Sequence, residues 1–335
     1  MANGRVTGLG LFSGGLDSIL AVRVLLDQGV NVVAFHLRLP FSPQGRAPRD
    51  VAGAAAKLGV PLWEEDAGRS YVTAMLSPRH GRGVALNPCL DCKVFIIKRA
   101  AARMAEANAA FIFTGDVLGQ RPMSQKRPQL ELIARKAGLA GKLLRPLSAQ
   151  LLEPTEAEIK GWVDRSRLLA LSGRGRKAQM ELATAWGIDF YPSPAGGCLL
   201  TDRHYCARLS DAAAHDRDVF EELPLLAFGR HFRLPSGAKV VVGRNRDENA
   251  ALQNLAGPED VLFESAAAAG ATALLRKGNA DDWPLAAAFA YRFSDAWGKK
   301  DRRVRQWRPG GRSSTIEAPA AVQLPPLIIG KPRDN

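Results

Sequence analysis

The sequence predicts an α/β protein, in which a parallel sheet with helices on both faces is followed by a smaller α+β domain at the C-terminus. The parallel sheet is indicated by four short apolar stretches within residues 1–116. These stretches lack the polar alternation of half-exposed strands, and helical segments separate them. The second domain is indicated by a change in pattern after about residue 200, where polar helical segments and strand pairs begin.

The elements expected in the first part alternate between strand and helix, and two of the helices end at a glycine, a common stop signal. In chain order they are a strand over 6–12, a helix over 17–29, a strand over 30–39, a helix over 49–59, a strand over 60–66, a helix over about 93–107 and a strand over 109–116. In open sheets of this kind, ligands bind beyond the carboxyl ends of the strands. We therefore expect the functional site where the first and fourth strands end.

The second part of the chain is expected to begin with polar helices. Residues 1–202 are assigned to the first domain, 203–224 to a helical connector and 225–335 to a basic second domain. Within the second domain, the pattern predicts two strands joined by a Pro-Ser-Gly turn and then a helix. The Pro-rich end of the chain is expected to be extended or poorly ordered.

The chain is basic in both halves. Its formal net charge is +13, of which residues 1–224 contribute +7 and residues 225–335 contribute +6. The segment 299–312 alone holds seven Lys or Arg and Trp307. Such an excess is typical of proteins that bind polyanions, the alternative being a solvated tail that only aids solubility. There is no pattern of a secretory signal, and the Ala-rich runs are too short to cross a bilayer, so we expect a cytoplasmic protein without a membrane partner.

The first strand runs into the segment SGGLDS at residues 13–18. Gly14 and Gly15 can take backbone angles that other residues avoid, and they leave their N–H groups open to a ligand. The following helix offers its own unpaired N–H groups to an anion. Asp17 would repel a phosphate unless a divalent cation lay between them, so its presence implies Mg²⁺. The sequence therefore predicts a nucleotide phosphate site, although an ordinary glycine turn before a helix is the alternative.

The segment resembles the PP-loop signature of the N-type ATP pyrophosphatases, S-G-G-x-D-S, at every fixed position. The resemblance implies the adenine nucleotide alpha hydrolase-like fold. It also implies that ATP is split between its α- and β-phosphates and that a substrate oxygen becomes adenylated, with release of AMP and pyrophosphate.

Four further stretches resemble the tRNA sulfurtransferases of this family, of the 4-thiouridine synthetase type, so that the resemblance covers residues 6–202. They are NPCLDCK (87–93), TGDVLGQRPMSQ (114–125), LLRPLSAQ (143–150) and SPAGGCLLTD (193–202). The lysine that many of these enzymes carry soon after R-P-L is missing here, which leaves the modified position of the tRNA open. The resemblance implies tRNA as a partner, together with a sulfur donor that is either sulfide or a persulfide carrier.

A pair of cysteines two residues apart, in a chain with only four, points to metal or redox chemistry. Thiolates from Cys89, Cys92 and Cys198 would bind three irons of a [4Fe-4S] cluster and leave the fourth iron open. Several thiolation enzymes of the PP-loop class carry this set. The alternatives are a zinc ion completed by Cys206 or His204, a persulfide on Cys198, and core thiols without a ligand.

The resemblance also assigns roles to individual residues. Those expected to hold ATP are Ser13, Gly14, Gly15, Asp17, Ser18, Phe35, His36, Thr114 and Gly115. Asp17, Asp116 and Cys198 are expected to be catalytic: Asp17 through Mg²⁺, Asp116 by orienting the base or a proton, and Cys198 by carrying sulfur. The alternative for Asp116 is that it only caps a turn, and the alternatives for His36 are a general acid or a residue that only lines the site. Two competing functions are an amide ligase acting on a small molecule and an ATP-sensing RNA- or ribosome-binding factor.

Residues 225–300 resemble the NFACT-R type of RNA-binding domain, through GRHFRLPSGAKVVVGRNRDEN. The resemblance implies phosphate contacts by basic side chains, which give affinity without sequence information. The residues expected to make them are Arg230, Arg233, Lys239, Arg244 and Arg246. Trp307 is expected either to stack on an unpaired base or to pack against its own domain.

Overall fold

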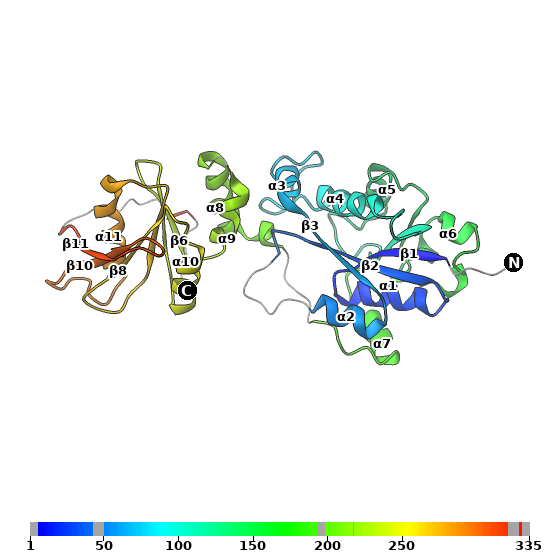
Figure 1. The fold of residues 1–335 in the computed structure, drawn as a ribbon. Helices are drawn as coiled ribbons and strands as arrows, with labels where there is room; N and C mark the ends of the chain where they lie inside the picture. Colours follow the sequence, from blue (N-terminus) through cyan, green and yellow to red (C-terminus); the bar gives the residue numbers. More distant parts are fainter. Residues whose placement is uncertain (1–5, 43–49, 193–197, 217, 321–327, 330–335) are drawn as a thin grey trace. The chain divides into compact units, whose positions relative to one another are not determined.

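The computed structural model describes residues 6–42, 50–192, 198–216, 218–320 and 328–329. The chain divides into two compact units, Met1–Thr201 and Asp202–Asn335 (Figure 1).

The first unit is built on a five-stranded parallel sheet with the order β3-β2-β1-β4-β5. Its strands are β1 (Thr7–Leu11), β2 (Asn31–Arg38), β3 (Leu62–Asp66), β4 (Phe111–Thr114) and β5 (Leu143–Leu144). The central strand β1 carries glycines beside the bulky strand β4. A Cβ atom added at Gly10 would lie 2.3 Å from the ring of Phe113, and one at Gly8 would lie 2.9 Å from the ring of Phe111. The small residues of β1 therefore make room for the aromatic side chains of β4.

Helices cover both faces of this sheet, as the sequence predicts (Figure 1). On one face lie α1 (Leu16–Leu26), α2 (Val51–Leu58) and α7 (Lys177–Ala185). On the other lie α3 (Gly68–Leu76), α4 (Cys89–Ala102) and α5 (Arg127–Lys136), while the short α6 (Glu156–Ile159) lies beyond β5. Most of α1 is buried, because apolar residues occur on nearly every side of it.

The second unit begins with α8 (Arg203–His215) and α9 (Val219–Leu226). An antiparallel seven-stranded sheet follows, with the order β11-β10-β8-β9-β7-β6-β12. Its strands are β6 (Arg230–Arg233), β7 (Lys239–Val242), β8 (Val261–Ser265), β9 (Ala273–Arg276), β10 (Arg303–Trp307), β11 (Ser314–Glu317) and β12 (Ile328–Ile329), and its helices are α10 (Arg246–Leu255) and α11 (Trp283–Arg292). The expected hairpin is β6–β7 and the expected helix is α10.

Within the Pro-rich end, which was expected to be extended or poorly ordered, residues 328–329 form the short strand β12. It pairs antiparallel with β6, with Ile328 opposite Phe232. A two-residue strand has too short a pattern to be detected in a sequence, and its main-chain bonds to β6 define it here.

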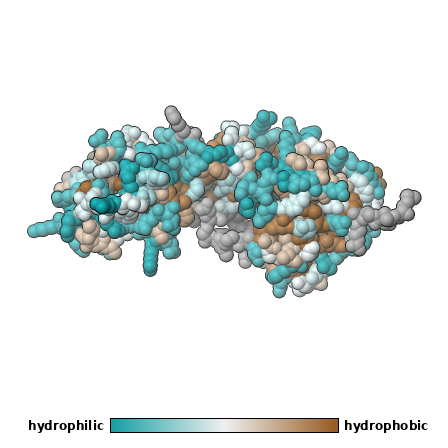
Figure 2. All heavy atoms as spheres, in the orientation of Figure 1, coloured by the Kyte–Doolittle hydropathy of each residue, from teal (hydrophilic) through white to brown (hydrophobic). Residues whose placement is uncertain are grey.

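In the ranges that the structure describes, every helix falls short of the length and apolar character needed to cross a bilayer. The face seen in Figure 2 is largely hydrophilic over the second unit, and its hydrophobic residues gather in limited areas of the first unit.

Candidate functional site: a phosphate loop and three thiols

The segment SGGLDS forms the turn between β1 and α1. Gly14 has φ +65°, the left-handed region that favours glycine, and a Cβ atom there would lie 3.3 Å from the Cα atom of Val51. Gly15 is the N-cap residue of α1 and has no side chain with which to cap the helix. The loop thus leads into the N-terminus of a buried helix, the arrangement that suits an anionic group.

The two serines brace this loop. The Ser18 hydroxyl donates to the carbonyl oxygen of Gly15 at 2.8 Å and accepts from the Ser13 backbone N–H at 3.3 Å. Ser18 is buried. Because these bonds hold the loop closed on itself, its shape is set before any ligand enters.

Asp17 carries the clearest sign of a ligand in this loop. Its Oδ2 accepts from Gln120 Nε2 at 3.1 Å, whereas its Oδ1 is buried with no hydrogen-bond partner among the described residues. Burial raises the pKa of Asp17, and the hydrogen bond from Gln120 and the charges of Arg176 and Arg121 offset only part of that rise. A buried carboxylate oxygen without a partner is costly. A Mg²⁺ ion would satisfy it, so the residues fit the expected metal and nucleotide.

The two arginines near Asp17 were not singled out from the sequence. Arg121 follows the T-G-D segment, and Arg176 precedes α7 in a Gly-Arg-Gly-Arg segment. The two loops meet through a bridge between Leu118 and Ser172. The clustering of Gly and Arg at 173–176 is the sequence signal for a basic loop near Asp17.

The end of β4 packs directly against the start of α1. A Cβ atom at Gly115 would lie 2.5 Å from the carbonyl oxygen of Asp17 and 2.7 Å from the backbone nitrogen of Ser18. Gly115 is therefore required for this approach of two backbones. Thr114 is buried beside it, and its hydroxyl donates to Asp116 Oδ2 at 2.9 Å.

Asp116 lies at the centre of a buried polar group. Its Oδ1 accepts from Lys93 Nζ and from Gln125 Nε2, each at 2.7 Å. Burial would raise the pKa of Asp116, but the charges of Lys93 and Arg145 and these two hydrogen bonds outweigh it and hold the pKa far below its usual range. Asp116 is thus an ionised carboxylate that fixes Lys93. Lys93 and Arg145 belong to two of the recognised motifs, but nothing in their spacing connects them to Asp116.

His36 and Phe35 lie at β2, next to the phosphate loop. The side chain of Phe35 is buried, and its carbonyl oxygen accepts from the backbone N–H of Phe12 at 2.8 Å. His36 Nδ1 lies 2.8 Å from the carbonyl oxygen of Phe12. A carbonyl can only accept, so Nδ1 carries the proton, and the ring is oriented by the same residue that leads into the loop.

Cys89 and Cys92 are the first and fourth residues of α4. The helix expected over about 93–107 begins earlier, directly after Pro88, so both cysteines lie within it and not before it. Residues three apart lie on one face of a helix. Asn87 Nδ2 donates to Cys89 Sγ at 3.2 Å, and Tyr71 Oη lies 3.1 Å from Cys92 Sγ.

Cys198 comes close to this pair from a distant part of the sequence. Burial raises the pKa of Cys92 to about 11, and the charges of Cys198 and Cys89 add to the rise. Burial also raises the pKa of Cys198, where Cys89 contributes again. The three thiols therefore lie near enough to interact electrostatically. Cys206 is buried on α8, in the second unit.

The thiols do not form a finished metal site. Among the described residues, no group of three or more His, Cys, Asp or Glu side chains is arranged to hold a metal ion. Three thiol groups are nevertheless a donor set that suits iron or zinc.

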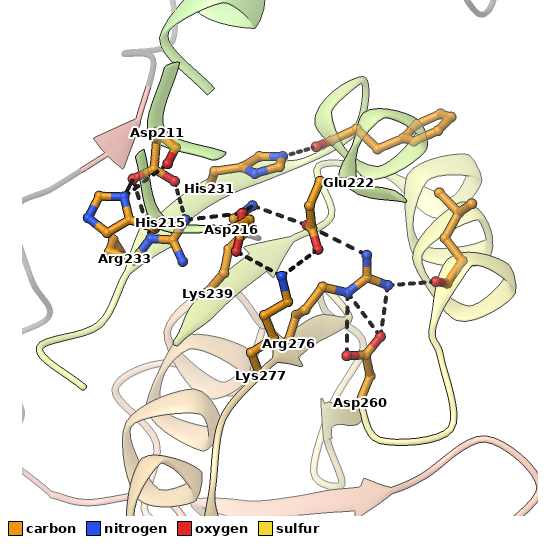
Figure 3. A network of polar contacts seen from close by, with 12 residues as sticks. Asp211, His215, Asp216, Glu222, His231, Arg233, Lys239, Asp260, Arg276 and Lys277 are labelled. Atoms are coloured by element: carbon orange, nitrogen blue, oxygen red, sulfur yellow. Dashed lines mark hydrogen bonds and ion pairs between the residues drawn. The ribbon is translucent and has the colours of Figure 1, made fainter. Parts of the chain in front are cut away.

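Two of the five basic residues expected to contact RNA lie inside the second unit (Figure 3). Lys239 is 2% exposed, and its Nζ contacts Asp216 Oδ2 at 3.1 Å and Glu222 Oε2 at 3.2 Å. Arg233 is 9% exposed and is paired with Asp211. Neither side chain is free to reach a phosphate, so the expectation that Lys239 and Arg233 contact RNA is wrong.

The other three lie nearer the surface. Arg244 is paired with Glu248, and the guanidinium of Arg230 lies 5.0 Å from the ring centroid of Phe293. Arg246 is exposed at the start of α10.

Comparison with known families finds a match in each of the two units. Residues 7–132 match the tRNA methyl transferase HUP domain, and residues 229–323 match the NFACT protein RNA binding domain. The tRNA-specific 2-thiouridylase of Tropheryma whipplei is 32% identical over 109 residues, which is 30% of this chain and 30% of that protein. The 2-thiouridylase of Dehalococcoides mccartyi is 30% identical over 117 residues, covering 31% of this chain and 32% of the relative.

The chain thus spans about a third of the length of the curated relatives it matches. Among solved structures, the U34-tRNA thiolase NcsA from Methanococcus maripaludis, with its [4Fe-4S] cluster, aligns with a TM-score of 0.34 at 14% identity, over 66% of this chain and 71% of the other. Residues 7–132, with their parallel sheet and SGGLDS loop, therefore belong to the HUP domains of the PP-loop family, and residues 229–323 belong to the NFACT family of RNA-binding domains.

Proposed function

We propose that the chain is an ATP-dependent tRNA uridine thiolase, in which the first unit adenylates a uracil carbonyl oxygen and then exchanges it for sulfur. The observation that supports this most directly is that one unit holds both a phosphate loop with an unpartnered Asp17 oxygen and three neighbouring thiols. An amide ligase would use the loop and leave the thiols without a role. The names of the 2-thiouridylase relatives support the same reaction class.

The residues of the loop would bind and polarise ATP. The N–H groups of Gly14, Gly15 and the first turn of α1 would hold the phosphates, and Asp17 would hold the Mg²⁺ that offsets charge on the departing pyrophosphate. Arg121 and Arg176 would add positive charge on the same side. Asp116, with both oxygens engaged, would act by keeping Lys93 in place rather than by moving a proton.

The thiols would deliver sulfur. Cys89, Cys92 and Cys198 would hold a [4Fe-4S] cluster, whose open iron supplies a site for sulfide; the alternative is a persulfide on Cys198. Tyr71 would donate a hydrogen bond to the Cys92 sulfur, and Asn87 donates one to the Cys89 sulfur. Anaerobic purification separates the two: the cluster predicts iron and labile sulfide in the protein, and the relay predicts neither.

The test of the reaction is nucleoside analysis of tRNA from a strain lacking the gene, complemented with single variants. Cys89→Ala, Cys92→Ala and Cys198→Ala should each remove the thiouridine while ATP is still split to AMP and pyrophosphate. Cys206→Ala, in the second unit, is the matched control and should restore it. A complete thiouridine content in the deletion strain, or formation of ADP and phosphate in place of AMP, would reject the proposal.

A further inference from the structure

We propose that Trp297, Arg292, Lys299 and Lys300 form a docking surface for an unpaired RNA base and its flanking phosphates. We call it the Trp297 surface. It rests on the proposed function only in taking RNA as the ligand of the second unit. Nothing in the sequence drew attention to Trp297, since the basic run around Trp307 is the more prominent feature.

Trp297 is unusual in its exposure. Among the described residues of the second unit it is the large hydrophobic side chain left most open, at 52%. It follows α11 in the turn that leads to β10. A single exposed apolar side chain is common on a protein surface, so the packing and the cations around this indole are what point to a binding role.

The ring is held in place rather than loose. The Tyr291 ring packs against it with centroids 5.3 Å apart, and the Tyr291 hydroxyl donates to the carbonyl oxygen of Lys299 at 2.9 Å. The backbone N–H of Trp297 donates to the carbonyl oxygen of Ser294 at 3.1 Å. The guanidinium of Arg292 lies 4.6 Å from the indole centroid. A platform fixed in this way loses little conformational freedom when a base stacks on it.

The cations of the Trp297 surface have no acidic partner. Within the described ranges, no ion pair involves Arg292, Lys299 or Lys300, and all three are exposed. The same turn holds two acidic residues, Asp295 and Asp301, of which Asp301 is paired with Arg303. The surface therefore carries more positive than negative charge close to the indole, the combination that attracts a phosphate backbone.

The neighbouring strand β10 is the opposite case. Its arginines are neutralised: Arg303 contacts Asp301 at 2.7 Å, and Arg305 contacts Glu264 at 2.8 Å. Trp307 packs against the apolar cluster of Leu225 and Leu252. Of the two alternatives for Trp307, the structure favours packing within its own domain.

An aromatic ring together with free cations suits a single-stranded nucleic acid better than a duplex. Unpaired bases stack on aromatic side chains or on arginine planes, whereas the bases of a duplex are already stacked on one another. We therefore expect the Trp297 surface to prefer a loop or a single strand.

The test measures binding of the full-length protein to three fluorescent RNAs: a short single strand, a hairpin with an open loop, and a duplex. Trp297→Ala should raise the Kd for the single strand and the hairpin roughly 5- to 100-fold, the range of base–aromatic stacking. Trp297→Phe should recover most of the affinity. Lys299→Ala should reduce the slope of log affinity against log salt by about 0.7.

Matched controls come from β10. Arg305→Ala removes a paired arginine and should change the Kd less than about twofold, whereas Arg292→Ala should weaken binding. Equal Kd values for wild type and Trp297→Ala, with both proteins folded by circular dichroism, would overturn the proposal. So would an equal loss for the duplex, or binding of a protein partner in place of RNA. If tRNA from the deletion strain keeps its thiouridine while Trp297→Ala still weakens RNA binding, the proposed reaction fails and the Trp297 surface stands.

Discussion

Replacing Asp116 with Asn should destabilise the first unit strongly. The Asp116 side chain is 3% exposed, and it neutralises Lys93 at 2.7 Å and the buried Arg145. Breaking a buried pair by removing one partner costs about 3–5 kcal/mol, because the remaining charge stays buried. Lys93 is 29% exposed and can turn toward water, which places the expected loss near the lower end, about 3 kcal/mol. Total stabilities of domains are only about 5–15 kcal/mol, so the loss would be large.

The assay is urea unfolding followed by circular dichroism, compared between wild type and Asp116→Asn across pH. The folded pKa of Asp116 lies below its ordinary value, so its stabilisation is complete above that value and is lost as pH falls through the folded pKa. The two proteins should therefore differ by a constant amount at neutral pH and converge in acid. Asp66→Asn is the matched control: its carboxylate is 70% exposed beside Arg38 and should matter little. A difference below about 1 kcal/mol for Asp116→Asn would refute the reasoning.

Three further changes test other parts of the structure. Asp17→Asn should stop AMP formation and leave the free energy of unfolding unchanged or higher, because burial already disfavours the carboxylate; a clear loss of stability would contradict this. Lys239→Met should lower the melting temperature markedly, since Asp216 and Glu222 lose a buried partner, without changing the salt dependence of RNA binding, and a reduced slope would return Lys239 to the RNA contacts. Gly115→Ala should destabilise the fold by about 1–3 kcal/mol, whereas Gly175→Ala, with open space around its Cβ position, should not, as thermal unfolding of both will show.

The phosphate loop and its sheet could be predicted from the sequence because the signals are local. Apolar strands without alternation indicate a parallel sheet, and a six-residue motif at the end of the first strand marks the loop. Helix α4 begins at Cys89, directly after Pro88. The expected start at about residue 93 was too late, because the proline was not taken as a helix start signal.

The roles of the charged residues could not be predicted, since they depend on contacts far apart in the chain. Lys239 stands in a strand whose four residues are all buried, and its acidic partners lie on or near α8 and α9. From the sequence alone, a lysine beside a run of valines is expected at the exposed edge of a sheet, because the acidic partners that allow its burial lie elsewhere in the chain. In the same way, composition does not distinguish the neutralised arginines of β10 from the unpaired cations of the Trp297 surface.

The ion pairs of Lys239 have a practical consequence for where the RNA-binding half of the molecule can be separated from the rest. The family match begins at residue 229, yet the carboxylates that compensate Lys239 are supplied by residues 216 and 222. A fragment that began at residue 229 would leave the ammonium group of Lys239 buried without its carboxylate partners. The smallest portion able to fold by itself therefore reaches back at least to Asp211 on α8, which pairs with the buried Arg233. Helices α8 and α9 thus supply carboxylates to the interior of the second unit and do more than connect it to the first.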